Sequence, residues 1–120
     1  MVMKPETQRV VEAVCKYFDL PLKDFHSKKR YREIINAKQY VVYILRMADQ
    51  YWLNRSCRYT WKEIAKVCGW GKVVGEHSTA IHHWEKMDGY VMVYSQYKHD
   101  LLNIGNELGL TFEGINLKAA

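Results

Sequence analysis

The segment from Arg32 to Trp52 constrains the fold more than any other part of the chain, because its apolar residues recur at helical spacing throughout. These residues are Ile34, Ile35, Ala37, Val41, Val42, Ile44, Leu45, Ala48 and Trp52. A stripe this wide is typical of a helix that neighbours touch on several sides. The sequence therefore predicts a long central helix within a bundle.

Helical spacing also marks both flanks of this segment. An amphipathic helix is expected from Thr7 to Phe18, and Asp19-Leu20-Pro21 should end it, because proline disfavours helix in the residue before it. A short helix should follow over Leu22 to His26. A final helix is expected from Tyr90 to Leu108, with Val93, Tyr97, Leu101, Ile104 and Leu108 on one face and Gly109 as its C-cap.

No segment has the alternating pattern of a strand. The expected fold is therefore all-α, a compact bundle of about five to six helices over residues 1–110, followed by a C-terminal tail over residues 111–120.

Between the central and final helices the sequence has the layout of a helix-turn-helix. Thr60-Trp61-Lys62-Glu63 fits a capping box at the start of a short helix that stops at Gly69. Gly69 to Gly75 contains three glycines and predicts a turn. A new helix should start near Glu76 to Ser78 and break or kink at Asp88-Gly89. In a helix-turn-helix, the second helix presents its N-terminal side chains to the major groove.

Charge is compatible with a nucleic-acid partner without selecting it. The chain of 120 residues has a net charge of +5, and Lys23 to Arg32 contains five basic residues and one acidic residue. Such a balance also suits an anionic membrane or an acidic protein, and a charge run is often just a solvated face. The three cysteines, Cys15, Cys57 and Cys68, form no CxxC pair, which favours free thiols in a reducing cytosol.

Several function classes are disfavoured. No apolar stretch approaches the length of a membrane span, and the N-terminus lacks the pattern of a signal peptide, so we expect no membrane partner and a cytoplasmic location. His77, His82, His83 and Cys68 lack zinc-ligand spacing, and no metal site is expected. Neither a hydrolytic constellation nor a GxxxxGK[ST] phosphate loop is present, so we expect no enzyme activity, cofactor or nucleotide.

Glu76-His77-Ser78-Thr79-Ala80-Ile81-His82-His83 resembles the signature of the DNA-binding C-terminal domain of the bacterial replication initiator DnaA. Order and spacing elsewhere agree with this resemblance. Tyr17 to Asp24 resembles the first helix and turn of that family, Ser27 to Arg30 its basic loop, Ala37-Lys38-Gln39 the start of its central helix, and Trp61 to Ile64 its short helix before the signature. The resemblance covers roughly Arg9 to Leu108 and implies a Trp-repressor-like helix-turn-helix domain that binds double-stranded DNA at DnaA-box-like sites.

The resemblance implies a role for individual residues. Arg30 matches the arginine that the family inserts into the minor groove, where a planar and always charged guanidinium suits a narrow A·T-rich groove. Lys28 and Lys29 would contact the DNA backbone beside it. Glu76, His77, Ser78 and Thr79 match the residues placed at the major groove. Ser78 and Thr79 could instead merely cap the helix, and both roles can hold together.

Four further residues are expected at the DNA backbone: Lys38, Gln39, Lys72 and Lys86. Lys38 and Gln39 match a basic-plus-glutamine pair of the family, and Lys72 stands in the altered turn. Lys86 lies three residues beyond His83, and a simply solvated lysine is an alternative there. His82 is expected to pack or to hold the turn, and Ile81 and Trp84 are expected in the core.

The sequence departs from the family pattern at three places. The turn before the signature is longer, Gly75 replaces the usual arginine, and Glu76 replaces an aspartate. The loop from Asn54 to Tyr59 is also extended. These changes affect the target sequence more than DNA binding itself. The expected role is control of replication initiation or of transcription, in a bacterial cytoplasm or nucleoid, on a protein that a phage or mobile element could encode. Replication or regulatory proteins are further expected partners, and the alternative is a protein-interaction module that keeps the fold without reading DNA.

Overall fold

The computed structural model describes residues 5–26, 31–47, 59–69 and 76–109, and these contain six helices and no strand. The helices are α1 (Pro5–Tyr17), α2 (Leu22–Phe25), α3 (Arg32–Met47), α5 (Trp61–Val67), α6 (Glu76–Val93) and α7 (Ser95–Leu108). The predicted all-α fold is confirmed. The expected tail over residues 111–120 lies outside the described residues, and the domain boundary at residue 110 stays a prediction.

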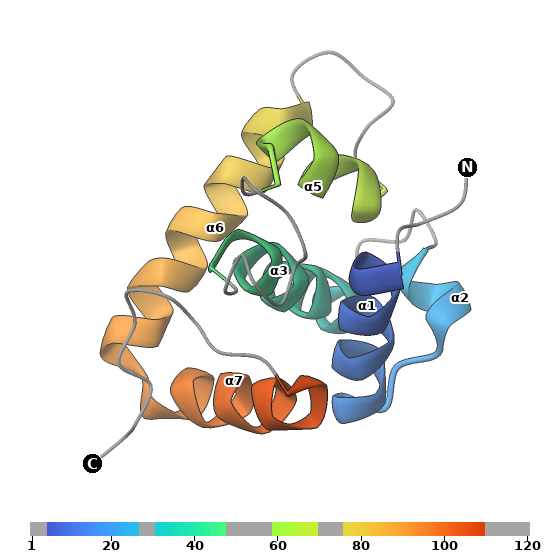
Figure 1. The fold of residues 1–120 in the computed structure, drawn as a ribbon. Helices are drawn as coiled ribbons and strands as arrows, with labels where there is room; N and C mark the ends of the chain where they lie inside the picture. Colours follow the sequence, from blue (N-terminus) through green and yellow to red (C-terminus); the bar gives the residue numbers. More distant parts are fainter. Residues whose placement is uncertain (1–4, 27–30, 48–58, 70–75, 110–120) are drawn as a thin grey trace.

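Helix α3 is the centre of the bundle (Figure 1), with α5 above it, α6 to its left, α7 below it, and α1 and α2 to its right. Helix α7 contacts both α1 and α6. Every residue from Ala37 to Leu45 is buried, which leaves this part of the helix no solvent face. A helix that is covered all round needs apolar residues on every side, and the wide stripe in the sequence provides them. The central helix is thus confirmed as far as Met47, and its expected extension to Trp52 lies outside the described residues.

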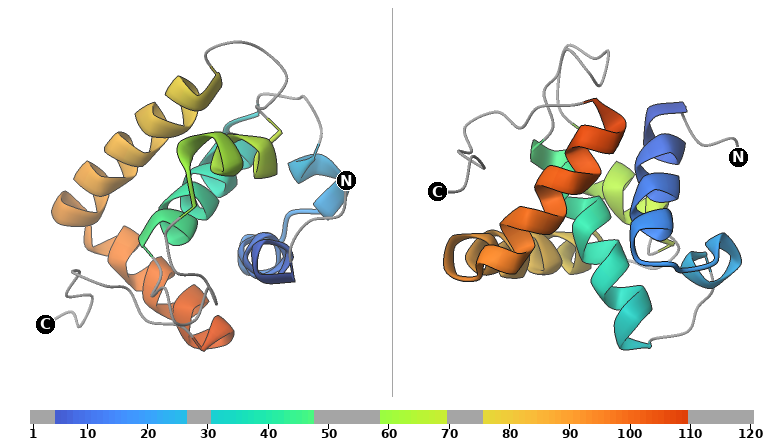
Figure 2. Two further views of the ribbon diagram at one scale, coloured as in Figure 1. Left: turned by 45° about the horizontal axis from the view of Figure 1, so that its top comes forward. Right: turned by 90° about the horizontal axis from the view of Figure 1, so that it is seen from below.

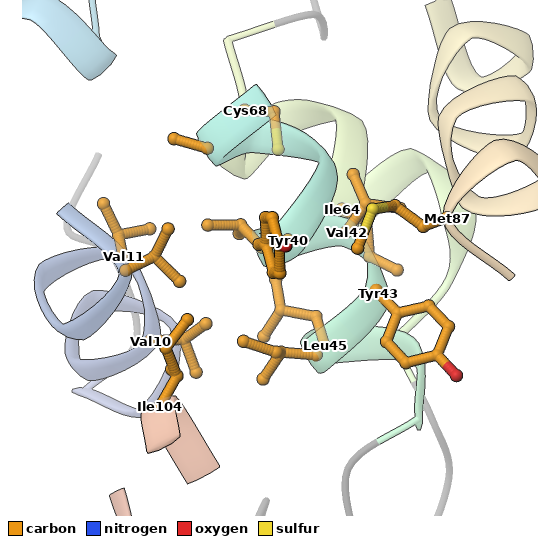
Figure 3. Packing of buried hydrophobic residues seen from close by; sticks show 14 of the residues in the cluster. Val10, Val11, Tyr40, Val42, Tyr43, Leu45, Ile64, Cys68, Met87 and Ile104 are labelled. Atoms are coloured by element: carbon orange, nitrogen blue, oxygen red, sulfur yellow. The ribbon is translucent and has the colours of Figure 1, made fainter. Parts of the chain in front are cut away.

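The core joins α3 to both sides of the bundle. Tyr40 of α3 lies between Val10 of α1 on one side and Ile64 of α5 on the other (Figure 3), and all three side chains are at most 1% exposed. Met87 of α6 and Ile104 of α7 complete the same cluster. Truncating a side chain of this kind destabilises a domain by about 2–5 kcal/mol, so this cluster is the main source of stability.

A buried polar group ties α7 to α1 and α3. Asp100 is 6% exposed, and its carboxylate accepts hydrogen bonds from the hydroxyls of Tyr17 at 2.6 Å and Tyr40 at 2.8 Å. The amide of Gln96 donates a third at 2.9 Å. Because a buried carboxylate is tolerated only when such donors satisfy it, Asp100 fixes how α7 docks. We call Tyr17, Tyr40, Gln96 and Asp100 the Asp100 cluster.

The ends of α1 and α7 lie where the sequence predicts them. Helix α1 ends at Tyr17, and Asp19 follows in the left-handed region with a φ of 54°. Gly109 caps α7 with a φ of 69°, the conformation in which glycine is favoured at this position.

The predicted break at Asp88-Gly89 is wrong. Helix α6 continues through Gly89 to Val93, and the chain instead turns at Tyr94, which has extended dihedrals of −110° and 115°. A glycine inside a helix costs about 1 kcal/mol, and the burial of Met87 and Val91 on either side offsets this. Val93, expected on the inner face of the final helix, is 72% exposed at the end of α6.

Candidate nucleic-acid interface

Helix α5 begins with the capping box that the sequence predicts. The Thr60 hydroxyl accepts a hydrogen bond from the backbone N–H of Glu63 at 3.2 Å, and the Thr60 N–H donates to the Glu63 carboxylate at 2.9 Å. Two amides that the helix itself cannot satisfy are therefore paired. Gly69 follows α5 with a φ of 81°, so the chain leaves this helix through a glycine-dependent turn.

Helices α5 and α6 pack directly against each other. The rings of Trp61 and Trp84 meet edge to face, with centroids 5.7 Å apart, and the guanidinium of Arg46 lies 4.3 Å from the Trp61 centroid. Trp84, expected in the core, is partly buried against it, and Ile81 is partly buried as well. Two short-linked helices in firm contact are the arrangement of a helix-turn-helix, and the turn over residues 70–75 lies outside the described residues.

The start of α6 places part of the predicted major-groove segment at the surface. Glu76 is the first residue of the helix, as predicted, but the side chains of Glu76 and His77 lie outside the described residues. Ser78 is exposed, Thr79 is partly exposed, and Ala80 is fully buried. The helix therefore presents Ser78 outward and turns Ala80 against the core.

His82 was expected to pack or to hold the turn. It is exposed and therefore does not pack in the core, and its alternative role of holding the turn depends on residues 70–75, which lie outside the described residues. Ser78, His82 and Lys86 are all exposed and follow one another at spacings of four residues, so they share one outer face of α6. His82 thus belongs to the same face as Ser78. The spacing of four residues between them in the sequence could have predicted this position.

The basic loop with Lys28, Lys29 and Arg30 lies outside the described residues, as does Lys72. Its two anchors are described. Phe25, at the end of α2, is completely buried, and the Tyr31 carbonyl accepts from the amides of Ile34 and Ile35 at the start of α3. In the left view of Figure 2, α2, α5 and the start of α6 lie along one side of the molecule, and α7 lies on the opposite side. The anchors of the basic loop and the start of α6 therefore occupy the same side.

Lys38 and Gln39 are buried, with 4% and 8% of their surface exposed, contrary to the surface position expected for a backbone contact. The Lys38 ammonium lies 5.7 Å from the centroid of the Phe25 ring, and burial lowers the Lys38 pKa. The Gln39 amide nitrogen lies 2.9 Å from Nδ1 of His83. Both side chains thus point into the protein toward other elements, because the long stem of lysine and the amide of glutamine find partners there.

His83 is a partly buried partner of Gln39 that sequence reasoning did not assign. Burial lowers the pKa of His83 to about 4, and the nearby His82, Lys86 and Lys38 act in the same direction. The imidazole is therefore neutral at pH 7, and its Nδ1 accepts a hydrogen bond from the Gln39 amide. The signal was present, since His83 lies three residues after buried Ala80 and four before buried Met87, on the inner face of α6.

The described residues contain no group of three His, Cys, Asp or Glu side chains placed to bind a metal. Within the same ranges, no helix is long and apolar enough to cross a membrane. Cys15 and Cys68 are free and buried, and burial raises their pKa values to about 11 and about 12, which makes both thiols poor nucleophiles.

Comparison with known proteins agrees with this geometry. The family model described as bacterial dnaA protein helix-turn-helix matches residues 7–87. The chain belongs to this family. Two similar relatives are the chromosomal replication initiator proteins DnaA of Bacteroides fragilis, 28% identical over 97 residues, and Bacteroides thetaiotaomicron, 27% identical over 97 residues. Each comparison covers 79% of this chain but only 17% and 18% of the respective relatives. No solved structure matches at a comparable level of significance.

Membership in the DnaA helix-turn-helix family supports DNA binding by this chain. The match ends at Met87, inside α6, although the core continues beyond it. Val91, Leu101 and Ile104 are buried in the same cluster as the matched residues. The DnaA-like helix-turn-helix therefore depends on α7 for part of its core.

Proposed function

We propose that the chain binds double-stranded DNA in a sequence-specific way at DnaA-box-like sites. The observation that carries this proposal is the exposed face of α6 with Ser78, His82 and Lys86. This helix packs on a capped α5 in a member of the DnaA helix-turn-helix family. Short hydroxyl and imidazole side chains on such a helix can approach base edges in the major groove.

Two segments would contact the duplex together. Glu76, His77, Ser78 and Thr79 would read the major groove, and Arg30 would enter the minor groove from the basic loop. Lys28, Lys29, Lys72 and Lys86 would neutralise phosphates and supply affinity without sequence information. Their support is the resemblance of the two segments and the position of the loop anchors on the same side as the start of α6.

The biological role that we propose is control of replication initiation or regulation of transcription. Its support is the similarity to two chromosomal replication initiator proteins. We propose that the chain occupies or competes for initiator sites on DNA, in a bacterial cytoplasm or nucleoid. It spans less than a fifth of the length of those relatives. Replication or regulatory proteins would then be its further partners.

A salt-titrated gel shift tests the proposal. One duplex carries a DnaA box, and a second carries the same bases in shuffled order. We expect tighter binding to the box at every salt concentration, with an affinity that falls steeply as salt rises, because phosphate contacts release counterions. Equal binding to both duplexes would leave only non-specific binding, and no binding at low salt would favour the alternative of a protein-interaction module.

A further inference from the structure

Lys38 occupies the point at which three elements meet behind the proposed DNA-binding side. Its ammonium lies 5.7 Å from the centroid of Phe25 in α2 and 4.0 Å from the place where a Cβ on Gly69 would lie. The Cys68 thiol, at the end of α5, lies 3.9 Å from the Lys38 carbonyl. Lys38 is thus in contact range of the helix before the basic loop and of the residues that lead into the turn of the helix-turn-helix.

Gln39 connects the same stretch of α3 to α6. Its amide nitrogen lies 2.9 Å from Nδ1 of His83, and both side chains are largely shielded from water. His83 lies one turn beyond Thr79 on the inner side of α6. The Gln39–His83 hydrogen bond therefore fixes the start of α6 against α3 at the level of the proposed reading residues.

We infer that Lys38, Gln39 and His83, which we call the Lys38 cluster, are positioning residues that hold α2, the helix before the basic loop, and the first half of α6 in the relative placement needed to contact one DNA site. This inference rests on the proposed DNA binding. In this inference Lys38 and Gln39 are buried residues that fix the packing of neighbouring helices. The family resemblance implies a phosphate contact for them instead.

The physical argument for such a role is preorganisation. Two contact segments that are separated in the chain bind one duplex tightly only if their spacing is set before binding, because ordering them afterwards reduces affinity. Burying an ammonium group has a desolvation cost that offsets the energy of its contacts. The buried Lys38 side chain therefore contributes little to the free energy of unfolding. Through Lys38 and Gln39, α3 contacts α2, the end of α5 and α6. A buried polar cluster of this kind can specify one packing arrangement of the helices among several of similar stability.

The test separates positioning from phosphate contact and from plain stability. The wild-type protein first selects its preferred duplex from a random pool, and the affinities for the selected and a shuffled duplex are then measured over a range of salt concentrations. We expect Lys38→Met and His83→Ala each to reduce the preference for the selected duplex by about tenfold, while affinity for the shuffled duplex and the slope of log affinity against log salt stay unchanged. His83→Asn should keep most of the preference, because its amide oxygen replaces the Nδ1 acceptor.

Two matched variants control for stability. Gln96→Ala removes a glutamine hydrogen bond to Asp100, and Lys98→Met removes a partly buried lysine, both on α7 at the opposite side of the molecule. Both should keep the preference, and melting curves establish that each variant is folded at the temperature of measurement.

Three results would overturn the inference. The first is a salt slope that falls by about one in Lys38→Met, since this marks a direct phosphate contact. The second is a preference that is unchanged in both Lys38→Met and His83→Ala, and the third is a wild-type protein that binds duplex DNA without any preference. A wild-type protein that binds no duplex would instead overturn the proposed function itself.

Discussion

The molecule contains two buried polar groups that differ in what they join. The Asp100 cluster lies between α1, α3 and α7, and one carboxylate there accepts three hydrogen bonds of 2.6–2.9 Å. The Lys38 cluster lies between α2, α3, the end of α5 and α6, and it contains an ammonium 5.7 Å from the centroid of an aromatic ring and an amide–imidazole hydrogen bond of 2.9 Å. The Asp100 cluster locks α7 onto α1 and α3, and the Lys38 cluster underlies the side proposed to bind DNA.

Buried polar groups therefore have two uses in this small domain. At the Asp100 cluster, where one carboxylate accepts three hydrogen bonds, removing one partner should first lower the free energy of unfolding. At the Lys38 cluster, which connects α2, α3 and α6 beneath the proposed DNA-binding side, removing one partner should first affect the placement of α6 relative to α2.

The largest expected effect is that of Asp100→Ala on stability. The variant loses three hydrogen bonds and leaves the buried Tyr40 hydroxyl without its acceptor, which should lower the free energy of unfolding by about 3 kcal/mol. Chemical denaturation measures this value, and Gln96→Ala, which removes only one of the three bonds, should lose about 1 kcal/mol. Similar small losses in both variants would refute the role of Asp100 as a lock.

Arg30→Ala should have the largest effect on DNA binding. Removing the proposed minor-groove guanidinium should weaken specific binding by about 2 kcal/mol, roughly thirtyfold, with little change in stability. Fluorescence anisotropy with a box-containing duplex measures the change. An effect no larger than that of Lys86→Ala would show that Arg30 is only a solvated loop residue.

The pH dependence of stability tests the burial of His83. Its pKa is about 4 in the folded protein, against 6.5 for the free side chain, so the unfolded chain binds the proton more readily between these values. Stability should therefore fall as pH decreases from 6.5 to 4, by on the order of 2 kcal/mol after allowance for partial solvent screening, and level off below. Denaturation at a series of pH values measures this. A variant with His83→Asn should lose this part of the pH dependence, and an unchanged profile would place His83 in water.

A smaller effect is expected for Ser78→Ala combined with Thr79→Ala. The double variant should lose about 1 kcal/mol of preference for the box over the shuffled duplex, because base contacts give specificity, while non-specific binding stays the same. Competition gel shifts measure the preference. If the preference survives, the start of α6 does not read the sequence.

The smallest expected effect is that of Lys86→Ala. An exposed phosphate contact contributes a few tenths of a kcal/mol at moderate salt, so binding to both duplexes should weaken equally and the salt slope should fall by about one. An unchanged slope would identify Lys86 as a solvated residue away from DNA.

Local signals in the sequence predicted the parts of the fold that depend on neighbouring residues. The Thr60–Glu63 capping box and the Gly109 cap were predictable because each is satisfied within one turn of its own helix. The helix break at Gly89 was mispredicted, because the buried Met87 and Val91 sustain the helix through tertiary contacts that local propensity does not contain.

The sequence predicted where the helices of the candidate site begin, but not which of its polar side chains are buried. The start of α6 at Glu76 follows from the glycine-rich turn, and the family resemblance named the segment correctly as part of a DnaA helix-turn-helix. The burial of Lys38 and Gln39 was not predictable, since it depends on Phe25, Gly69 and His83 arriving from three other elements. Long polar side chains near an expected DNA surface can point either way, and only the packed structure decides which.

The central claim is that the side formed by α2, α5 and the start of α6 meets DNA. Backbone amide NMR of the chain, titrated with a box-containing duplex, tests it most directly. We predict that the signals of Ser78, His82 and Lys86, together with those of Tyr31 and Arg32 beside the basic loop, shift on binding, while those of His99 and Asn103 on α7 stay in place. Shifts concentrated on α7 would show that another surface binds the duplex, and no shifts at low salt would show that the chain does not bind it.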